Sequence, residues 1–294
     1  MTAFASSTTI SSVSNPRIKF ARSLRRRAAR EESSQFFVEG IRAVAEAVQL
    51  GAKVETVIVA PELLTSALAH EVIQRVPRSA RLEVTADVFR SLSVQENPQG
   101  MGAIVRQHWA DLDSVQAEMG LCWIALESVQ YPGNLGTVLR TSEAVGGAGV
   151  IMLGHATDPY DPFCVRASMG AIFSQRLVWA DLGTLLTWKR RSGGFIVGTS
   201  PSAATDYQAL IYPSPLVLLM GSEQHGLSAE LLAACDCLVR IPMVGRCDSL
   251  NLAVSASTVL YEVFNQRRAA PEFSPFAFPD QAAKPPLIAG TEET

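Results

Sequence analysis

Long apolar runs are missing from this chain of 294 residues, although 48% of its residues are hydrophobic. No run approaches the roughly 20 apolar residues that a membrane-spanning helix needs, so the sequence predicts no membrane segment. Charged residues are few, at 18%. A chain of this length and composition buries a sizeable core, arranged as one large or two modest domains.

Cysteine is scarce and odd in number, with five thiols that lie mostly in apolar or helical surroundings. This pattern indicates reduced thiols in a cytoplasmic protein rather than a disulfide framework. Cys235 and Cys237 lack a second pair at the spacing of a zinc site, and the four histidines form no recognisable ligand set. We therefore predict no metal site.

An excess of positive charge is absent as well, since the net charge is -3 and the pI is about 5.9. Contact with RNA would have to come from local clusters of basic residues. One such cluster precedes the first acidic residue, Glu31, and contains Arg17, Lys19, Arg22, Arg25, Arg26, Arg27 and Arg30. A solvated helix face is the alternative interpretation, but a mildly acidic RNA-binding protein must find its affinity for phosphate somewhere.

The Ser- and Arg-rich start of the chain also has the composition of a mitochondrial transit peptide. We prefer to place it in the fold, because Asn15 and Pro16 are a good N-cap and first residue for a helix. Only residues 1–12 are predicted to be a disordered leader.

Strand and helix patterns alternate in two blocks, which predict a small α/β domain at residues 13–106 and a larger one at residues 121–268. The polar stretch at 107–120 is predicted to be a linker, and the Pro-rich tail at 269–294 to be disordered or to lie on the surface. In the larger block, helical crossovers between strands indicate a parallel sheet covered on both faces. Its predicted strands are 121–126, 149–153, 195–199, 216–220 and 238–241, and its predicted helices are 134–145, 165–173, 182–191 and one that starts at Ser249.

The most unusual residues lie between Val217 and Glu262. The strand at 216–220 ends in a loop with Gly221, Ser222 and Glu223, and a second strand is stopped by Pro242 before a polar loop. Ligands of open α/β sheets bind outside the carboxyl ends of the strands, so we predict a site here.

Three segments resemble, in order and spacing, the motifs of the SpoU/TrmH family of RNA ribose 2′-O-methyltransferases. They are PGNLGTVLRTSEAVGGAG at residues 132–149, GSEQHGLS at 221–228 and IPMVGRCDSLNLAVSAS at 241–257. The resemblance covers residues 120–268. The first block, through GIRAV at 40–44 and ENPQGMGAIV at 96–105, resembles the ribosomal-protein L30e-like domain that precedes the catalytic domain in many members.

The resemblance implies a C-terminal, trefoil-knotted, parallel-sheet methyltransferase domain with a smaller N-terminal L30e-like α/β domain that binds the RNA substrate. It also implies a homodimer packed through the knot, and S-adenosylmethionine bound by the loops at 199–201, 221–226 and 241–251. The cofactor-binding residues that it assigns are Thr199, Gly221, Ile241, Pro242, Met243, Leu250 and Asn251.

The resemblance gives Arg140 the key role in catalysis. Asn134 and Glu223 are expected to hold it, with Ser249 and Asn251 near the methyl donor or the target ribose. A guanidinium stays protonated, so we interpret Arg140 as a clamp on the target phosphate that polarises the hydroxyl, and not as a simple base. Taken alone, Arg140 is a solvated helix arginine and Glu223 a helix-start charge; the three motifs together favour the functional interpretation.

The RNA-binding residues predicted from the basic cluster and from a further family segment are Arg17, Lys19, Arg22, Arg25, Arg26 and Arg166. For Arg166 a surface salt bridge is an equal alternative. The L30e-like block and YDPFCVRASMGAIFS at 160–174 favour ribosomal RNA over tRNA as the substrate. Two alternatives remain: a catalytically silent RNA-binding or ribosome-assembly factor, disfavoured by the intact motif residues, and a nicotinamide enzyme, disfavoured by the missing GxGxxG.

Overall fold

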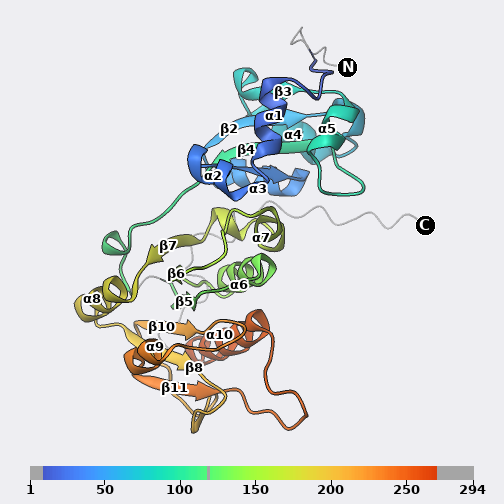
Figure 1. Cartoon of the computed structure of the whole chain (residues 1–294). Coiled ribbons are helices and arrows are strands. Elements are labelled where there is room, and N and C mark those ends of the chain that lie inside the picture. Colours follow the sequence, from blue (N-terminus) through green and yellow to red (C-terminus); the bar gives the residue numbers. More distant parts are fainter. Residues whose placement is uncertain (1–8, 118–119, 270–294) are drawn as a thin grey trace.

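The computed structural model describes residues 9–117 and 120–269, which form two α/β units, one above the other in Figure 1. The N-terminal unit has a four-stranded sheet of order β1-β4-β2-β3, in which β2 and β3 pair parallel and the other neighbours antiparallel. Its strands are β1 (Gln35–Glu39), β2 (Val54–Val59), β3 (Arg81–Glu83) and β4 (Met101–Arg106). Its helices are α1 (Pro16–Ser23), α2 (Arg27–Ser33), α3 (Ile41–Gln49), α4 (Ala67–Arg75) and α5 (Ala86–Leu92), with short 3-10 turns η1 (Pro61–Leu63) and η2 (Arg78–Ala80).

The C-terminal unit has a seven-stranded parallel sheet of order β7-β6-β5-β10-β8-β11-β9. Its strands are β5 (Trp123–Glu127), β6 (Gly149–Leu153), β7 (Arg176–Ala180), β8 (Phe195–Thr199), β9 (Thr205–Asp206), β10 (Leu216–Met220) and β11 (Cys237–Arg240). Its helices are α6 (Pro132–Ala144), α7 (Pro162–Ala167), α8 (Leu182–Ser192), α9 (Ala229–Ala234) and α10 (Leu252–Arg268), with the 3-10 turn η4 (Ala171–Phe173). This sheet confirms the predicted α/β fold with a parallel sheet in the larger unit.

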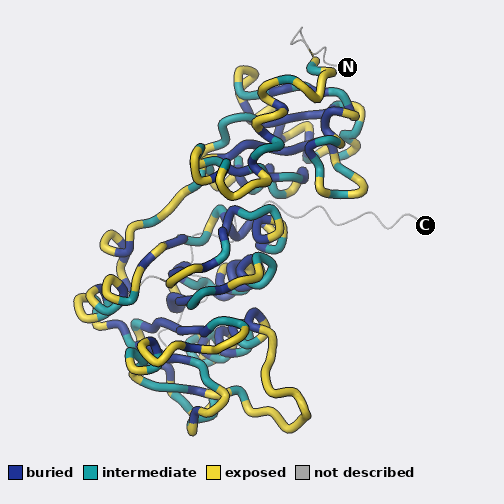
Figure 2. Tube along the Cα trace, viewed as in Figure 1, coloured by how far each residue is buried: buried dark blue, intermediate teal, exposed yellow. Residues whose placement is uncertain are grey.

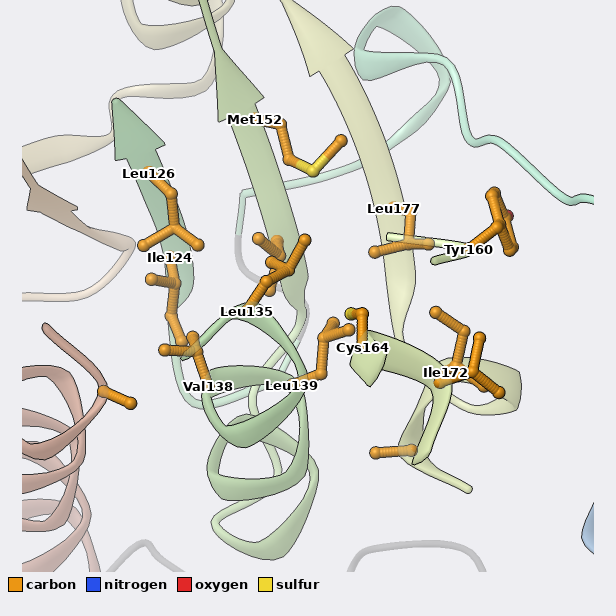
Figure 3. Packing of buried hydrophobic residues seen from close by; sticks show 14 of the residues in the cluster. Ile124, Leu126, Leu135, Val138, Leu139, Met152, Tyr160, Cys164, Ile172 and Leu177 are labelled. Carbon is orange, nitrogen blue, oxygen red and sulfur yellow. The ribbon is translucent and has the colours of Figure 1, made fainter. Parts of the chain in front are cut away.

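Burial on both faces explains why the central strands are almost wholly apolar. Along β5, Ile124 and Leu126 join one core cluster, whereas Trp123 and Ala125 join another on the opposite face, as the two-residue period of a strand requires. Helices α6, α7 and α10 cover the first face, and α8 and α9 cover the second. Figure 3 shows side chains of α6 against β5 and β6 in the first cluster.

Several element boundaries differ from the predictions. The predicted helix at 165–173 is broken after α7, because Met169 (φ 50°) and Gly170 (φ 96°) take left-handed backbone conformations. The last helix starts at Leu252 rather than at Ser249, with Asn251 as its N-cap. Strand β7, the two-residue strand β9 and helix α9 were not predicted.

The two ends of the chain lie mostly outside the described residues, as do 118–119 of the predicted linker. Ile10, in the segment predicted as a disordered leader, pairs with the end of β3: its amide donates to Glu83 O (2.9 Å), and its carbonyl accepts from the Thr85 amide (3.1 Å). The predicted linker also contains the 3-10 turn η3 (Leu112–Ser114), and Ala110 bridges to Val178 of β7. Within residues 9–117 and 120–269, no helix is long and apolar enough to cross a membrane.

Arg30 joins the two units through a buried ion pair. Its side chain is 2% exposed, and Nε lies 2.7 Å from Oδ2 of Asp158, which follows β6. Nη1 donates to the carbonyls of Leu24 and Arg25, and Nη2 lies 3.5 Å from Asp161. Arg30 was predicted to extend a basic RNA-facing cluster, but this burial makes it an internal connection between the units.

Candidate active site

Parallel neighbours bring the predicted loops to one edge of the sheet. Strand β8 lies between β10 and β11, and all three run in the same direction. The segments at 199–201, 221–226 and 241–251 follow the carboxyl ends of these strands, so they gather at that edge. Strand β5 pairs with β10 on the side of β10 that faces away from β8. It leads into α6, which carries Asn134 and Arg140.

A chain of hydrogen bonds connects the three sequence motifs. Glu223 Oε1 accepts from the Asn134 side-chain amide at 3.0 Å. Asn134 Oδ1 in turn accepts from Asn251 Nδ2, also at 3.0 Å. The side-chain oxygen of Asn251, Oδ1, accepts from the backbone amides of Ala253 and Val254, which caps α10. These partners determine how both amides are oriented, because each nitrogen meets an acceptor and each oxygen meets a donor.

Glu223 also holds the loop between β5 and α6. Its carboxylate accepts from the backbone amides of Gln130 (3.0 Å) and Tyr131 (3.3 Å). Glu127, at the end of β5, accepts from the Ser228 amide at 2.8 Å and so fixes the start of α9. The sequence did not lead us to predict the roles of Glu127 or of the two backbone donors. Glu127 could have been noticed as an acidic residue at the end of a buried strand.

Arg140 is exposed on α6, and its side chain makes no hydrogen bond or ion pair with any residue that the structure describes. The predicted support of Arg140 by Asn134 and Glu223 is therefore not a direct contact: those two residues bind each other and Asn251. Arg140 is anchored instead by its helix, whose Leu135, Val138 and Leu139 are fully buried. An exposed guanidinium without a partner among the described residues is available to an anionic ligand.

The segment at 241–251 is the most open part of the candidate site (Figure 2). Ile241 is half-buried, whereas Pro242, Ser249 and every residue between them are exposed, as is Leu250. Met243 and Leu250 present apolar side chains that are 38% and 40% exposed. Thr199 lies at the end of β8, where its hydroxyl donates to the sulfur of Met220 at 3.5 Å.

Gly221, which we expected to leave room for a ligand, also lies against the backbone of its own loop. A Cβ at this position would lie 2.0 Å from the carbonyl carbon of Gly226 and 2.2 Å from the Leu227 amide nitrogen. The close approach is made by the loop's own backbone, which pairs Ser222 with Gly226.

The predicted RNA-binding residues divide into two groups. Arg22 and Arg25 bind the end of α5, through Ser91 and through the carbonyls of Leu92 and Ser93. Exposed basic side chains without a hydrogen bond or ion pair to a described residue are Arg17, Lys19, Arg26 and Arg166. Arg166 lies on α7 beside α6, whereas the others belong to the N-terminal unit, distant from the 241–251 segment in Figure 1.

No metal-type cluster of three or more His, Cys, Asp or Glu side chains occurs in the described part of the chain. The chemistry of the site instead comes from one carboxylate, two amides, one hydroxyl and one free guanidinium. Such a set can orient a hydroxyl and bind a phosphate.

Comparison with known proteins identifies the family. Residues 122–261 match the model of the SpoU rRNA Methylase family, and residues 15–103 match the MRM3-like substrate binding domain. The 23S rRNA (uridine(2479)-2′-O)-methyltransferase of Streptomyces viridochromogenes is 33% identical over 245 residues, which cover 81% of this chain and 85% of that protein. The chain belongs to the SpoU rRNA methylase family.

Solved SpoU structures have the same fold over most of their length. The AdoMet-bound rRNA methyltransferase from Sinorhizobium meliloti is 35% identical with a TM-score of 0.81, covering 90% of this chain and 98% of that one. The SpoU methyltransferase AviRb from Streptomyces viridochromogenes, in complex with AdoMet, is 31% identical with a TM-score of 0.79, covering 87% and 99%. The predicted enzyme class, an S-adenosylmethionine-dependent RNA 2′-O-methyltransferase, is confirmed by these SpoU relatives.

Proposed function

We propose that this SpoU protein methylates a ribose 2′-hydroxyl of ribosomal RNA, with the three-motif hydrogen-bond network as its active site. The single observation that carries the proposal is the continuous chain of hydrogen bonds from Glu223 through Asn134 to Asn251, which connects the three motifs. Helix α6, which carries Asn134, also carries Arg140, which is unpaired in the described part of the chain. Nothing in the fold itself needs an exposed arginine there, and a network that holds three loops together suits a site that must align two substrates.

Arg140 is assigned to the RNA. A ribose hydroxyl attacks only when its oxygen is aligned with the methyl group and its proton is shared or removed as the bond forms. An arginine offers planar, forked donors to a phosphate and stays charged, so it clamps the target nucleotide and polarises the hydroxyl through that phosphate. Asn134 and Glu223 act as positioning residues, and Ser249 and Asn251 line the side where donor and ribose meet.

The methyl donor is assigned to the loops after β8, β10 and β11. S-adenosylmethionine supplies an electrophilic methyl group when it is bound. Thr199, Gly221, Ile241, Pro242, Met243, Leu250 and Asn251 are the residues that would hold it. Their composition fits: backbone groups can bind the adenine edge, and the exposed apolar side chains of Met243 and Leu250 await a partner surface.

The N-terminal unit is assigned to recruitment of RNA. Its match to a substrate-binding domain supports an L30e-like RNA-binding domain at 13–106, a linker at 107–120 and a catalytic domain at 121–268. Ribosomal RNA is favoured over tRNA because the relatives from Streptomyces viridochromogenes and Sinorhizobium meliloti described above, which span most of both chains, are named as rRNA methyltransferases. Such a substrate is consistent with a cytoplasmic location.

A homodimer with a trefoil-knotted catalytic domain completes the proposal. Helix α10 exposes Val254 (51%) and Tyr261 (53%), which are seven residues apart and therefore share one face of the helix. Val244 and Leu250, just before α10, are also exposed. A second subunit packed on this face would bury these side chains and cover the open 241–251 segment. Strand β10 lies between β5 and β8, both of which precede it in the sequence. This strand order supports a knot, in which a late segment of the chain re-enters the sheet through an earlier loop.

The test is to incubate the protein with labelled S-adenosylmethionine and separate pools of ribosomal RNA and tRNA, and then to map the labelled nucleotide. We expect label in ribosomal RNA, and none when the mapped nucleotide carries a 2′-deoxyribose. Label only in tRNA would show that tRNA, and not ribosomal RNA, is the substrate. Label that survives the 2′-deoxy substitution would contradict ribose methylation. Donor binding without transfer to either pool would favour a silent RNA-binding factor.

A further inference from the structure

A cavity of about 240 Å³ lies at the junction of the two units, away from the network described above. Its N-terminal wall includes Arg25, Arg42 and Gln95, and its other wall is α7 with Arg166, followed by Met169. Ligand pockets for drug-sized molecules measure roughly 300–1,000 Å³, so a cavity of this size suits a smaller group such as one nucleobase.

The charges around this cavity favour an anion. Three arginines line it, against a single carboxylate, Glu39, which is already bound to the Val94 amide (3.1 Å) and the Ser93 hydroxyl. Arg166 is exposed and has no bonded partner among residues 9–117 and 120–269. Arg42 pairs with Glu46 at 3.2 Å and Arg25 donates to the carbonyls of Leu92 and Ser93, which leaves Arg166 as the arginine of the cavity without a partner among the described residues.

The cavity also has an apolar wall and a free amide. Met169 and Val94 are 46% and 53% exposed, and Met169 adopts a left-handed backbone (φ 50°) that non-glycine residues rarely take. The Gln95 side chain makes no hydrogen bond within the described chain, so its donors and its acceptor are both available. A flat apolar surface beside an amide matches the face and edge of a base.

From this arrangement we infer that the cavity binds one unpaired nucleotide of the RNA substrate, with its phosphate on Arg166 and its base between Met169, Val94 and Gln95. The inference rests on the proposed function, since it names a second contact of the same RNA. The nucleotide is a neighbour of the target rather than the target. Helix α7 packs against α6, where a Cβ on Gly136 would lie 2.7 Å from the Ala167 Cβ. Arg140 lies about one helical turn beyond Gly136 and Arg166 is next to Ala167, so we place one RNA strand across both arginines.

The junction is built to keep this cavity in shape. The buried Arg30–Asp158 pair connects the units, and the Tyr160 hydroxyl donates to the His108 carbonyl at 2.6 Å while it accepts from the His108 amide at 2.9 Å. Both walls are thereby held before RNA arrives, which reduces the ordering cost of binding. Such a contact would select RNA by an unpaired base next to the methylated ribose.

The experiment uses the full chain with ¹³C-methyl-labelled methionine, titrated with UMP, CMP, AMP and GMP. Met169 is assigned through Met169→Leu, and Met243 through Met243→Leu as the reporter of the cofactor loops. We expect at least one nucleotide to shift Met169 and leave Met243 unchanged, with the shift lost in Arg166→Ala and retained in Arg78→Ala, an exposed arginine outside the cavity. A shift at Met243 alone, or none at Met169, would overturn the proposal.

RNA affinity provides the second arm, with protein-free ribosomal RNA as the probe. Arg166→Ala and Gln95→Ala should each weaken binding, Arg166→Ala by about tenfold because a charged contact is lost, with S-adenosylmethionine affinity unchanged. Parental affinity in both variants would overturn the nucleotide site while leaving the proposed function intact. A parental enzyme that methylates no RNA would overturn the proposed function, and this inference with it.

Discussion

Asn134 donates its side-chain amide to Glu223 Oε1 at 3.0 Å, which connects residues that are 89 positions apart in the sequence. The same amide accepts from Asn251, so one asparagine joins the segment after β5 to those after β10 and β11. A small change in any of these side chains therefore disturbs three loops at once.

Glu223→Gln should lower turnover by about ten- to a hundredfold. Both carboxylate oxygens of Glu223 accept hydrogen bonds, whereas the NH₂ group of a glutamine would face one of these N–H donors without an acceptor. The matched control is Glu230→Gln, in the first turn of α9, whose carboxylate is not part of the network. Single-turnover methylation measures the loss, and circular dichroism checks the fold. Equal rates for both variants would mean that the network does not support catalysis.

Arg30→Met should lower the free energy of unfolding by about 3–5 kcal/mol, because it leaves Asp158 largely buried without its partner. Arg90→Met is the control: its pair with Asp87 is more than half exposed and lies within one helix, so its loss should cost no more than about 0.5 kcal/mol. Urea unfolding of both variants provides the comparison. Similar midpoints would show that the junction pair is not a stabilising connection.

Tyr261→Asp should convert a dimer to a monomer, because a carboxylate would be buried at the centre of the exposed face of α10. Leu50→Asp places the same charge on an equally exposed apolar residue of the N-terminal unit and should leave the mass unchanged. Sedimentation equilibrium measures both. A monomeric parental protein, or a dimeric Tyr261→Asp variant, would contradict dimerisation through α10.

S-adenosylmethionine should slow the reaction of Cys247 with a disulfide reagent severalfold, since this exposed thiol lies in the loop assigned to the donor. Three of the other thiols should react slowly, because burial raises the pKa of Cys122 to about 12, that of Cys235 to about 11 and that of Cys164 well above its ordinary value. Cys247→Ser should remove the fast phase. Unchanged kinetics with saturating donor would remove this loop from the donor site.

Sequence patterns were sufficient where a property is local. The all-apolar β10 has the composition of a strand buried on both faces, and the Asn15 cap of α1 is visible in two letters of sequence. The order and spacing of the three motifs predicted which segments belong together. Parallel pairing of β8, β10 and β11 then brings those segments to one edge of the sheet.

Properties that depend on distant partners were not predictable. Arg30 has the same sequence context as the basic residues around it, and only Asp158, 128 positions later, turns it inward. In the same way, the close approach of Gly226 to Gly221 depends on the fold of that loop and could not be predicted from the sequence. The break at Met169 requires a left-handed methionine, which propensity alone disfavours.

We propose that Arg140 acts on RNA during methyl transfer and has no part in holding the fold. Single-turnover methylation at saturating RNA and S-adenosylmethionine tests it in Arg140→Ala, with Arg140→Lys as the charge-conserving comparison. We predict unchanged donor affinity and thermal stability in both variants and loss of most of the transfer rate in Arg140→Ala. Arg140→Lys should recover little of that rate, because an ammonium cannot reproduce a forked contact. Transfer by Arg140→Ala at close to the parental rate would contradict this proposal.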